Sequence, residues 1–163
     1  MITKNDLLKT LEAPLLYWST ASKELISLFL GKKAADMVGF DQRSPHHCYT
    51  LFEHCIHTVD HINSEANNVM TDTDLLRVAA FFHDIAKPQV AFEKNGRLVF
   101  YGHAHKSADM AEGLLINLGF DTEEISDNIK GQLNKMKKMY FIFNLQAGKA
   151  IISMILLNRQ DLL

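Results

Sequence analysis

The 163-residue sequence lacks several features that would define its class at once. Its two cysteines, Cys48 and Cys55, form neither a Cys-x-x-Cys pair nor a disulfide framework, which favours a reducing cytoplasm. We expect both cysteines to be small buried side chains. No apolar run reaches membrane-spanning length, and the N-terminus lacks the apolar core of a signal peptide. We therefore expect a soluble cytoplasmic protein with no membrane partner.

The sequence also lacks a large excess of charge of either sign, because its formal net charge is only -2. Without a global basic field the chain is not expected to bind bulk DNA, and a phosphate-bearing ligand would need local positive charge or a metal. No internal repeat, low-complexity tract or Pro/Ser-rich linker appears in the sequence. We therefore expect residues 1–163 to form a single domain with one core.

Helical periodicity dominates the sequence. The dipeptide Asn95-Gly96 lies between two short β-like runs and predicts a hairpin near residues 89–101. The predicted fold class is all-α, a compact single-domain helical bundle with that one hairpin. A first helix is expected from about residue 3 to a break near Pro14, and a second from there to residue 30, where Gly31 ends it. Further helices are expected at 49–67, 75–87, 105–118, 122–137 and 145–161.

All eight histidines lie between His46 and His105. On the helix expected at 49–67, His54, His57 and His61 fall in one arc beside an apolar stripe, at the edge of the core. Imidazole is the commonest metal ligand and the usual acid–base group near neutral pH. A packed or hydrogen-bonded side chain is the simpler interpretation of His57 and His61.

The pair His83-Asp84 lies on a predicted helix that is apolar nearly all round, so we expect that helix in the middle of the domain. A buried ionisable pair is costly unless it is paired or bound to a metal. Because adjacent helical residues point about 100° apart, a shared ion would have to sit over the helix end, which Pro88 supplies. The alternative is a structural ion pair.

The candidate constellation combines imidazoles and carboxylates, which suit Mn, Fe, Co, Ni, Zn or Mg. A structural zinc site is disfavoured, because no cysteine pair is available. Its members are His54, His83, Asp84, His103 and Asp161.

The segment FFHDIAKP at residues 81–88 resembles the signature of the HD superfamily of metal-dependent phosphohydrolases. The wider frame is similar too, with HHCYTLFEHCIHTV before it and GRLVFYGHAHKSADMAEGLLINLGF and ISMILLNRQDLL after it. The frame most resembles the HD domain beside the nucleotidyltransferase domain of CCA-adding tRNA enzymes and related stand-alone proteins. The resemblance covers about residues 42–161, with residues 1–41 expected as helices packed on this core.

The resemblance implies one divalent metal ion held by His54, His83, Asp84 and Asp161. The metal would bind a substrate phosphate and activate a water. Related domains often carry a further histidine where this chain has Gln132, which favours one metal over two. Asp161 lies two residues from the end of the sequence, where a chain can fray.

The resemblance also implies roles for residues that are not ligands. Lys87 would reach a phosphate oxygen. A close alternative is that Lys87 only interacts, as a cation at the end of a helix, with the negative end of the helix dipole. His103 would bind phosphate, protonate the leaving oxygen or ligate a second metal, and His47 and Lys106 would contact substrate at the rim.

The expected activity is hydrolysis of a phosphomonoester or phosphodiester, with a nucleotide, a 2′,3′-cyclic nucleotide or an RNA end as the phosphate-bearing substrate. Two alternatives stay open at this point. One is a non-catalytic HD domain that senses a nucleotide or binds a partner. The other is a structural or regulatory domain detached from a larger enzyme, such as a tRNA nucleotidyltransferase.

Overall fold

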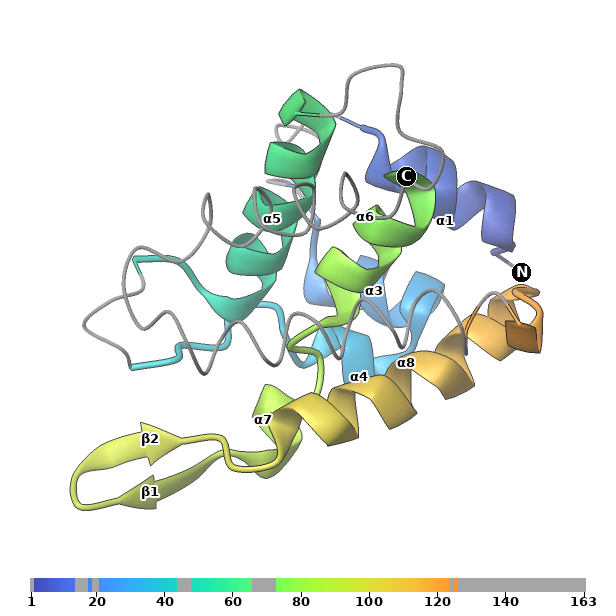
Figure 1. The fold of residues 1–163 in the computed structure, drawn as a ribbon. Helices are drawn as coiled ribbons and strands as arrows, with labels where there is room; N and C mark the ends of the chain where they lie inside the picture. The colour runs from blue at the N-terminus through green and yellow to red at the C-terminus, as the bar shows by residue number, and fades with distance from the viewer. Residues whose placement is uncertain are drawn as a thin grey trace, which may run out of the picture.

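A computed structural model of the chain describes residues 2–13, 18, 21–43, 48–65, 73–123 and 125. The described part is helical apart from one two-stranded hairpin, which confirms the predicted all-α class with a hairpin insertion (Figure 1). The elements in chain order are α1 (Lys4–Leu11), α3 (Lys23–Leu30), α4 (Lys32–Ala35), α5 (Leu51–Glu65), α6 (Thr73–Phe82), α7 (Lys87–Val90), β1 (Phe92–Lys94), β2 (Arg97–Val99) and α8 (His103–Leu118).

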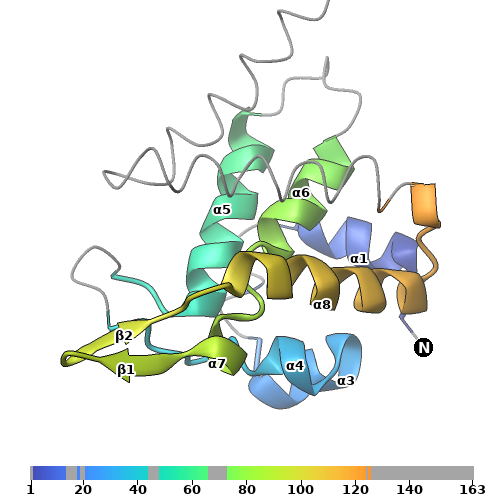
Figure 2. The same cartoon turned by 60° about the horizontal axis from the view of Figure 1, so that its bottom comes forward.

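Helix α6 lies at the centre of the fold, where it contacts α1, α5 and α8. Residues 78–82 of this helix are all buried, as expected for a helix that is apolar on nearly every side. Helix α5 lies alongside α6 in both orientations of the ribbon and turns the stripe of Leu51, Cys55, Val59 and Ile62 into the core (Figures 1 and 2). The predicted central position of the segment before His83-Asp84 is confirmed.

The end of α6 differs from the prediction. The helix ends at Phe82, residues 83–86 form a turn, and α7 begins at Lys87. The N–H of Ile85 donates to the carbonyl of Phe82 (3.2 Å) and that of Lys87 to the carbonyl of Asp84 (3.0 Å), so the chain tightens well before Pro88. Pro88 does not stop α6: it lies in the first turn of α7, where the missing N–H costs no intrahelical bond.

The hairpin follows the predicted turn chemistry. Asn95 and Gly96 both have positive φ (52° and 72°), as a type I′ turn requires, and Phe92 pairs with Val99. The hairpin extends away from the helices at one end of the molecule (Figures 1 and 2). The left-handed conformation of Gly102 (φ 75°) then turns the chain into α8, which begins at His103, two residues earlier than expected.

Several other expectations can be placed. Cys55 is buried as predicted, but Cys48 is exposed because it precedes α5 in a stretch without regular structure, so the prediction was wrong for Cys48. Of the helix expected at 122–137, only residues 122, 123 and 125 are described, and the first two are helical. The helix expected at 145–161 lies outside the described residues, as do His47, Gln132 and Asp161. Within the described residues, no helix is both long and apolar enough to span a bilayer.

Candidate metal centre

Packing of α5 on α6 brings three predicted ligands together. His54 lies in the first turn of α5, and His83 and Asp84 occupy the turn that follows α6. Nε2 of His54 is 3.2 Å from Nε2 of His83, and Oδ2 of Asp84 is 3.1 Å from His83 Nε2 and 3.8 Å from His54 Nε2. One ligand atom from each residue lies within 4.8 Å of the other two.

A hydrogen bond to the backbone orients the ring of His83. Nδ1 of His83 is 2.7 Å from the carbonyl oxygen of Ala80, an acceptor, so the Nδ1 proton is donated there. Nε2 is then the nitrogen that faces Asp84 and His54. Histidines that bind metals usually donate the N–H of their other ring nitrogen to such an acceptor, which fixes the orientation of the ring.

Asp84 is buried to 1% exposure, yet neither of its oxygens accepts a hydrogen bond of ordinary geometry within the described part of the chain. The side chains of His83, Lys87 and His103 approach its carboxylate instead. Buried carboxylate oxygens left without hydrogen bonds are costly and call for an ion or another strong partner.

The two buried groups shift each other's pKa in opposite directions. Burial alone lowers the pKa of His83, but the adjacent carboxylate of Asp84 outweighs burial, with help from Cys55, and holds that pKa well above its ordinary value. Burial alone raises the pKa of Asp84, but His83 and Lys87 together hold it well below the ordinary range. In the absence of a metal, these opposite shifts favour an ionised carboxylate beside a protonated imidazole.

The three side chains fit a divalent metal. Ligand atoms about 2.1 Å from one ion lie about 3.0 to 3.4 Å apart in octahedral or tetrahedral geometry. Two of the separations seen here, 3.1 and 3.2 Å, lie in this range, and the third, 3.8 Å between His54 and Asp84, is longer. Imidazole nitrogen and carboxylate oxygen are also a donor set for such ions. The cluster of His54, His83 and Asp84 could therefore hold a metal between its three ligand atoms.

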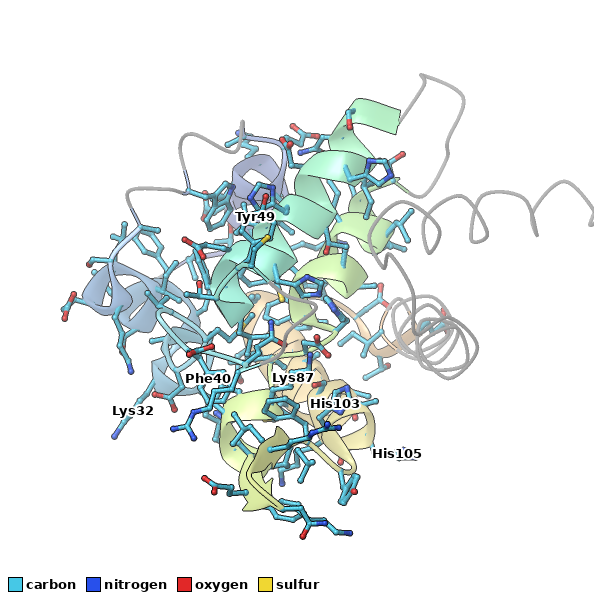
Figure 3. All side chains as sticks on the ribbon, turned by 90° about the vertical axis from the view of Figure 1, so that its left-hand side faces the viewer. Lys32, Phe40, Tyr49, Lys87, His103 and His105 are labelled. Atoms are coloured by element: carbon cyan, nitrogen blue, oxygen red, sulfur yellow. The ribbon has the colours of Figure 1, made fainter. Side chains whose placement is uncertain are left out.

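Lys87 and His103 lie on the two sides of the Asp84 carboxylate. Nζ of Lys87 is 2.6 Å from Oδ2, and Nε2 of His103 is 3.3 Å from Oδ1. Nδ1 of His103 is 2.7 Å from the carbonyl oxygen of Phe100, to which it donates, so Nε2 is the nitrogen turned toward the centre. Figure 3 shows the labelled Lys87 and His103 next to each other, in front of the start of α8.

The structure adds Gln42, which the sequence analysis did not single out. Its Oε1 accepts a hydrogen bond from Nζ of Lys87 (2.7 Å), while its Nε2 is buried without a partner in the described chain. Because the ammonium can only donate, the amide orientation is fixed, with Nε2 as the unused donor. No sequence pattern marks this residue, since a glutamine in a loop is ordinary.

The remaining candidates lie away from these contacts. Lys106 is exposed in the first turn of α8, and no hydrogen bond or ion pair of the described chain brings its side chain to the cluster. His57 stacks on Tyr49, with ring centroids 4.1 Å apart, which confirms that it is a packed residue. His47 and Asp161 lie outside the described residues.

Comparison with known families agrees with this centre. The family model of the HD domain matches residues 51–161, more than half of the chain. HD domains are generally metal-dependent phosphohydrolases. No curated protein and no solved structure matches the chain. The match runs through the α5 histidine and the His-Asp turn whose side chains converge here, and the chain belongs to the HD domain family.

Proposed function

We propose that this chain hydrolyses phosphate esters with the help of one divalent metal held by His54, His83 and Asp84, with Asp161 as a fourth ligand. The observation that carries the proposal is the convergence of two imidazole nitrogens and a buried carboxylate within 4.8 Å. A bound metal would lower the pKa of a water toward neutrality and polarise a phosphoryl oxygen.

Lys87 and Gln42 are suited to hold the phosphoryl group. The ammonium of Lys87 supplies buried positive charge beside the ligand cluster, and Nε2 of Gln42, held next to it by the Oε1 contact, has no acceptor among the described residues. An anionic phosphoryl oxygen could accept from that Nε2 and be attracted by the charge of Lys87, and both interactions become stronger in a dry site. His47 and Lys106 are proposed as contacts at the rim.

His103 is suited to protonate the leaving oxygen. Nδ1 donates to the carbonyl of Phe100, so a proton on Nε2 points toward the centre, where Nε2 lies 3.3 Å from Oδ1 of Asp84. During hydrolysis the water gives up one proton to the solvent and its oxygen forms a bond to phosphorus. The bond from phosphorus to the leaving oxygen breaks, the proton of His103 Nε2 passes to that oxygen, and a proton from the solvent restores His103.

The substrate is proposed to be a phosphomonoester or phosphodiester of a nucleotide, a 2′,3′-cyclic nucleotide or an RNA end. The resemblance to the HD domain of CCA-adding enzymes supports including the cyclic nucleotides and RNA ends. The test is phosphate or alcohol release from such a panel with Mn, Co, Ni, Zn or Mg. We expect turnover by the wild type and none by Asp84→Ala.

Stoichiometric metal without turnover across the panel would contradict this proposal. It would favour the alternative of an HD domain that binds a nucleotide or a partner without chemistry.

A further inference from the structure

A cavity of about 320 Å³ lies along α5, and none of the roles proposed above uses it. Its walls are mostly apolar and aromatic, with a few polar groups, which is the usual character of a small-molecule site. The residues that line it include Trp18, Tyr49, Thr50, Phe52, Glu53 and His57.

The cavity and the metal centre share one helix. Glu53 directly precedes the ligand His54, and His57 follows it by one turn, about 4.5 Å further along the axis. In the view of Figure 3 the labelled Tyr49 lies above Lys87 and His103, next to α5. A ligand with its phosphate at the metal centre could therefore extend into the cavity.

Tyr49 offers a stacking surface in this cavity. Its ring packs on His57 with an interplanar angle of 28°, and the residue remains 43% exposed. Contact with His57 fixes the ring, so an incoming planar group would not have to order it first. Nucleobases of every kind can stack on such exposed aromatic rings, because each base has a flat π face.

Glu53 supplies a polar edge beside the ring. Its Oε2 accepts hydrogen bonds from N and Oγ1 of Thr50, both at 2.8 Å, which holds the carboxylate in place. A carboxylate so held can accept from the exocyclic amino group of adenine, guanine or cytosine. A planar base with an amino group would use both the aromatic wall and the acceptor at its edge, whereas an alkyl chain would leave the acceptor unused.

We propose that this cavity binds the base of the substrate, so that the substrate is a nucleoside phosphate, with bases that carry an amino group preferred. This inference rests on the proposed hydrolase function and adds to it the part of the protein that binds the base. Tyr49 stacks on the base, Glu53 accepts from its amino group, and the phosphate lies at Lys87 and the metal ligands.

The test uses the intrinsic fluorescence of Trp18, the only tryptophan of the chain and part of the cavity wall. The full metal-loaded chain is titrated with adenosine 5′-monophosphate, uridine 5′-monophosphate and glycerol 3-phosphate. We expect a saturable signal that is strongest for the adenine nucleotide and absent for glycerol phosphate. Tyr49→Ala should weaken adenine nucleotide binding by about 10-fold, and Tyr49→Phe should restore it.

Tyr101→Ala is the matched control, because Tyr101 is 62% exposed on the segment after the hairpin and does not line the cavity. Equal affinity for glycerol phosphate and the nucleotides, or equal effects of Tyr49→Ala and Tyr101→Ala, would overturn the inference. Adenosine titrated into the His83→Ala/Asp84→Ala double variant separates the two proposals. Binding there without any turnover by the wild type defeats the hydrolase and keeps the base site.

Discussion

The ammonium nitrogen of Lys87 lies 2.6 Å from Oδ2 of Asp84, the same oxygen that faces both His54 and His83. In the metal-free centre this ammonium provides positive charge that the buried carboxylate needs. A metal bound to the two histidines and Asp84 would meet the same oxygen. Lys87 and the metal would therefore be neighbours of like charge that repel each other. A phosphate bound between them would reduce this repulsion.

Replacement of Lys87 by methionine separates its two roles. We expect Lys87→Met to bind metal as tightly as the wild type or several-fold more tightly, because a repelling charge is removed. Hydrolysis should fall by about 100-fold, the usual cost of losing one group that stabilises the transition state. Isothermal titration with the metal and steady-state kinetics measure the two effects. Lys9→Met, at an exposed position of α1, is the control, and a loss of metal binding in Lys87→Met would argue for a purely structural lysine.

Removal of either ligand of the His-Asp turn should empty the centre. We expect about one divalent ion per wild-type chain and almost none in His83→Ala or Asp84→Ala, because each change removes one donor of a small buried set. Elemental analysis of purified protein gives the ratio. His57→Ala, one turn from His54 on α5 but packed on Tyr49, should keep its metal. Equal loss of metal in His57→Ala would show that the ligand set is assigned wrongly.

Stabilisation by the metal should increase as the pH rises. The raised pKa of His83 means that this group stabilises the metal-free fold at low pH, and that the contribution is lost as the pH rises through the raised value. A metal requires the neutral ring, so protons compete with it until the same pH is passed. The lowered pKa of Asp84 keeps the carboxylate charged throughout this range. The gain in Tm on metal addition should therefore grow with pH until the raised pKa of His83 is passed, and His83→Ala should abolish this slope.

The sequence predicted those parts of the fold and of the centre that depend on local pattern. The hairpin turn at Asn95-Gly96 and the end of α3 at Gly31 follow from backbone conformations that few residues allow. Grouping His54 with His83 and Asp84 followed from the family motif, since periodicity alone cannot tell which helices pack together. The early end of α6 escaped prediction, because the tight turn at 83–86 is stabilised by tertiary contacts. Gln42 escaped it too, because its role depends on contact with Lys87, 45 positions later.

Gln42 should matter for phosphate binding and not for the metal. In Gln42→Met the buried donor Nε2 and the acceptor for Lys87 are both lost with little change in volume. We expect KM for a phosphate ester to rise by about 10-fold, in line with the loss of one or two hydrogen bonds to a charged group, while the metal content is unchanged. Kinetics that show an unchanged KM would mean that ordered water satisfies this amide, and that Gln42 only packs.

The hydroxyl of Ser107 should stabilise both the fold and the His-Asp turn. Oγ of this fully buried residue on α8 accepts a hydrogen bond from the N–H of Ala86 at 3.1 Å, two residues after Asp84. In Ser107→Ala that buried N–H loses its acceptor, which costs about 1–3 kcal/mol, and the turn that positions Asp84 loses its tie to α8. Urea unfolding should show the lower free energy of unfolding, and titration should show weaker metal binding. Ser64→Ala is the matched control, because that exposed hydroxyl donates only to carbonyls of its own helix, and its effect should stay within about 0.5 kcal/mol. An equal loss in both variants would mean that the Ala86 contact does not support the turn.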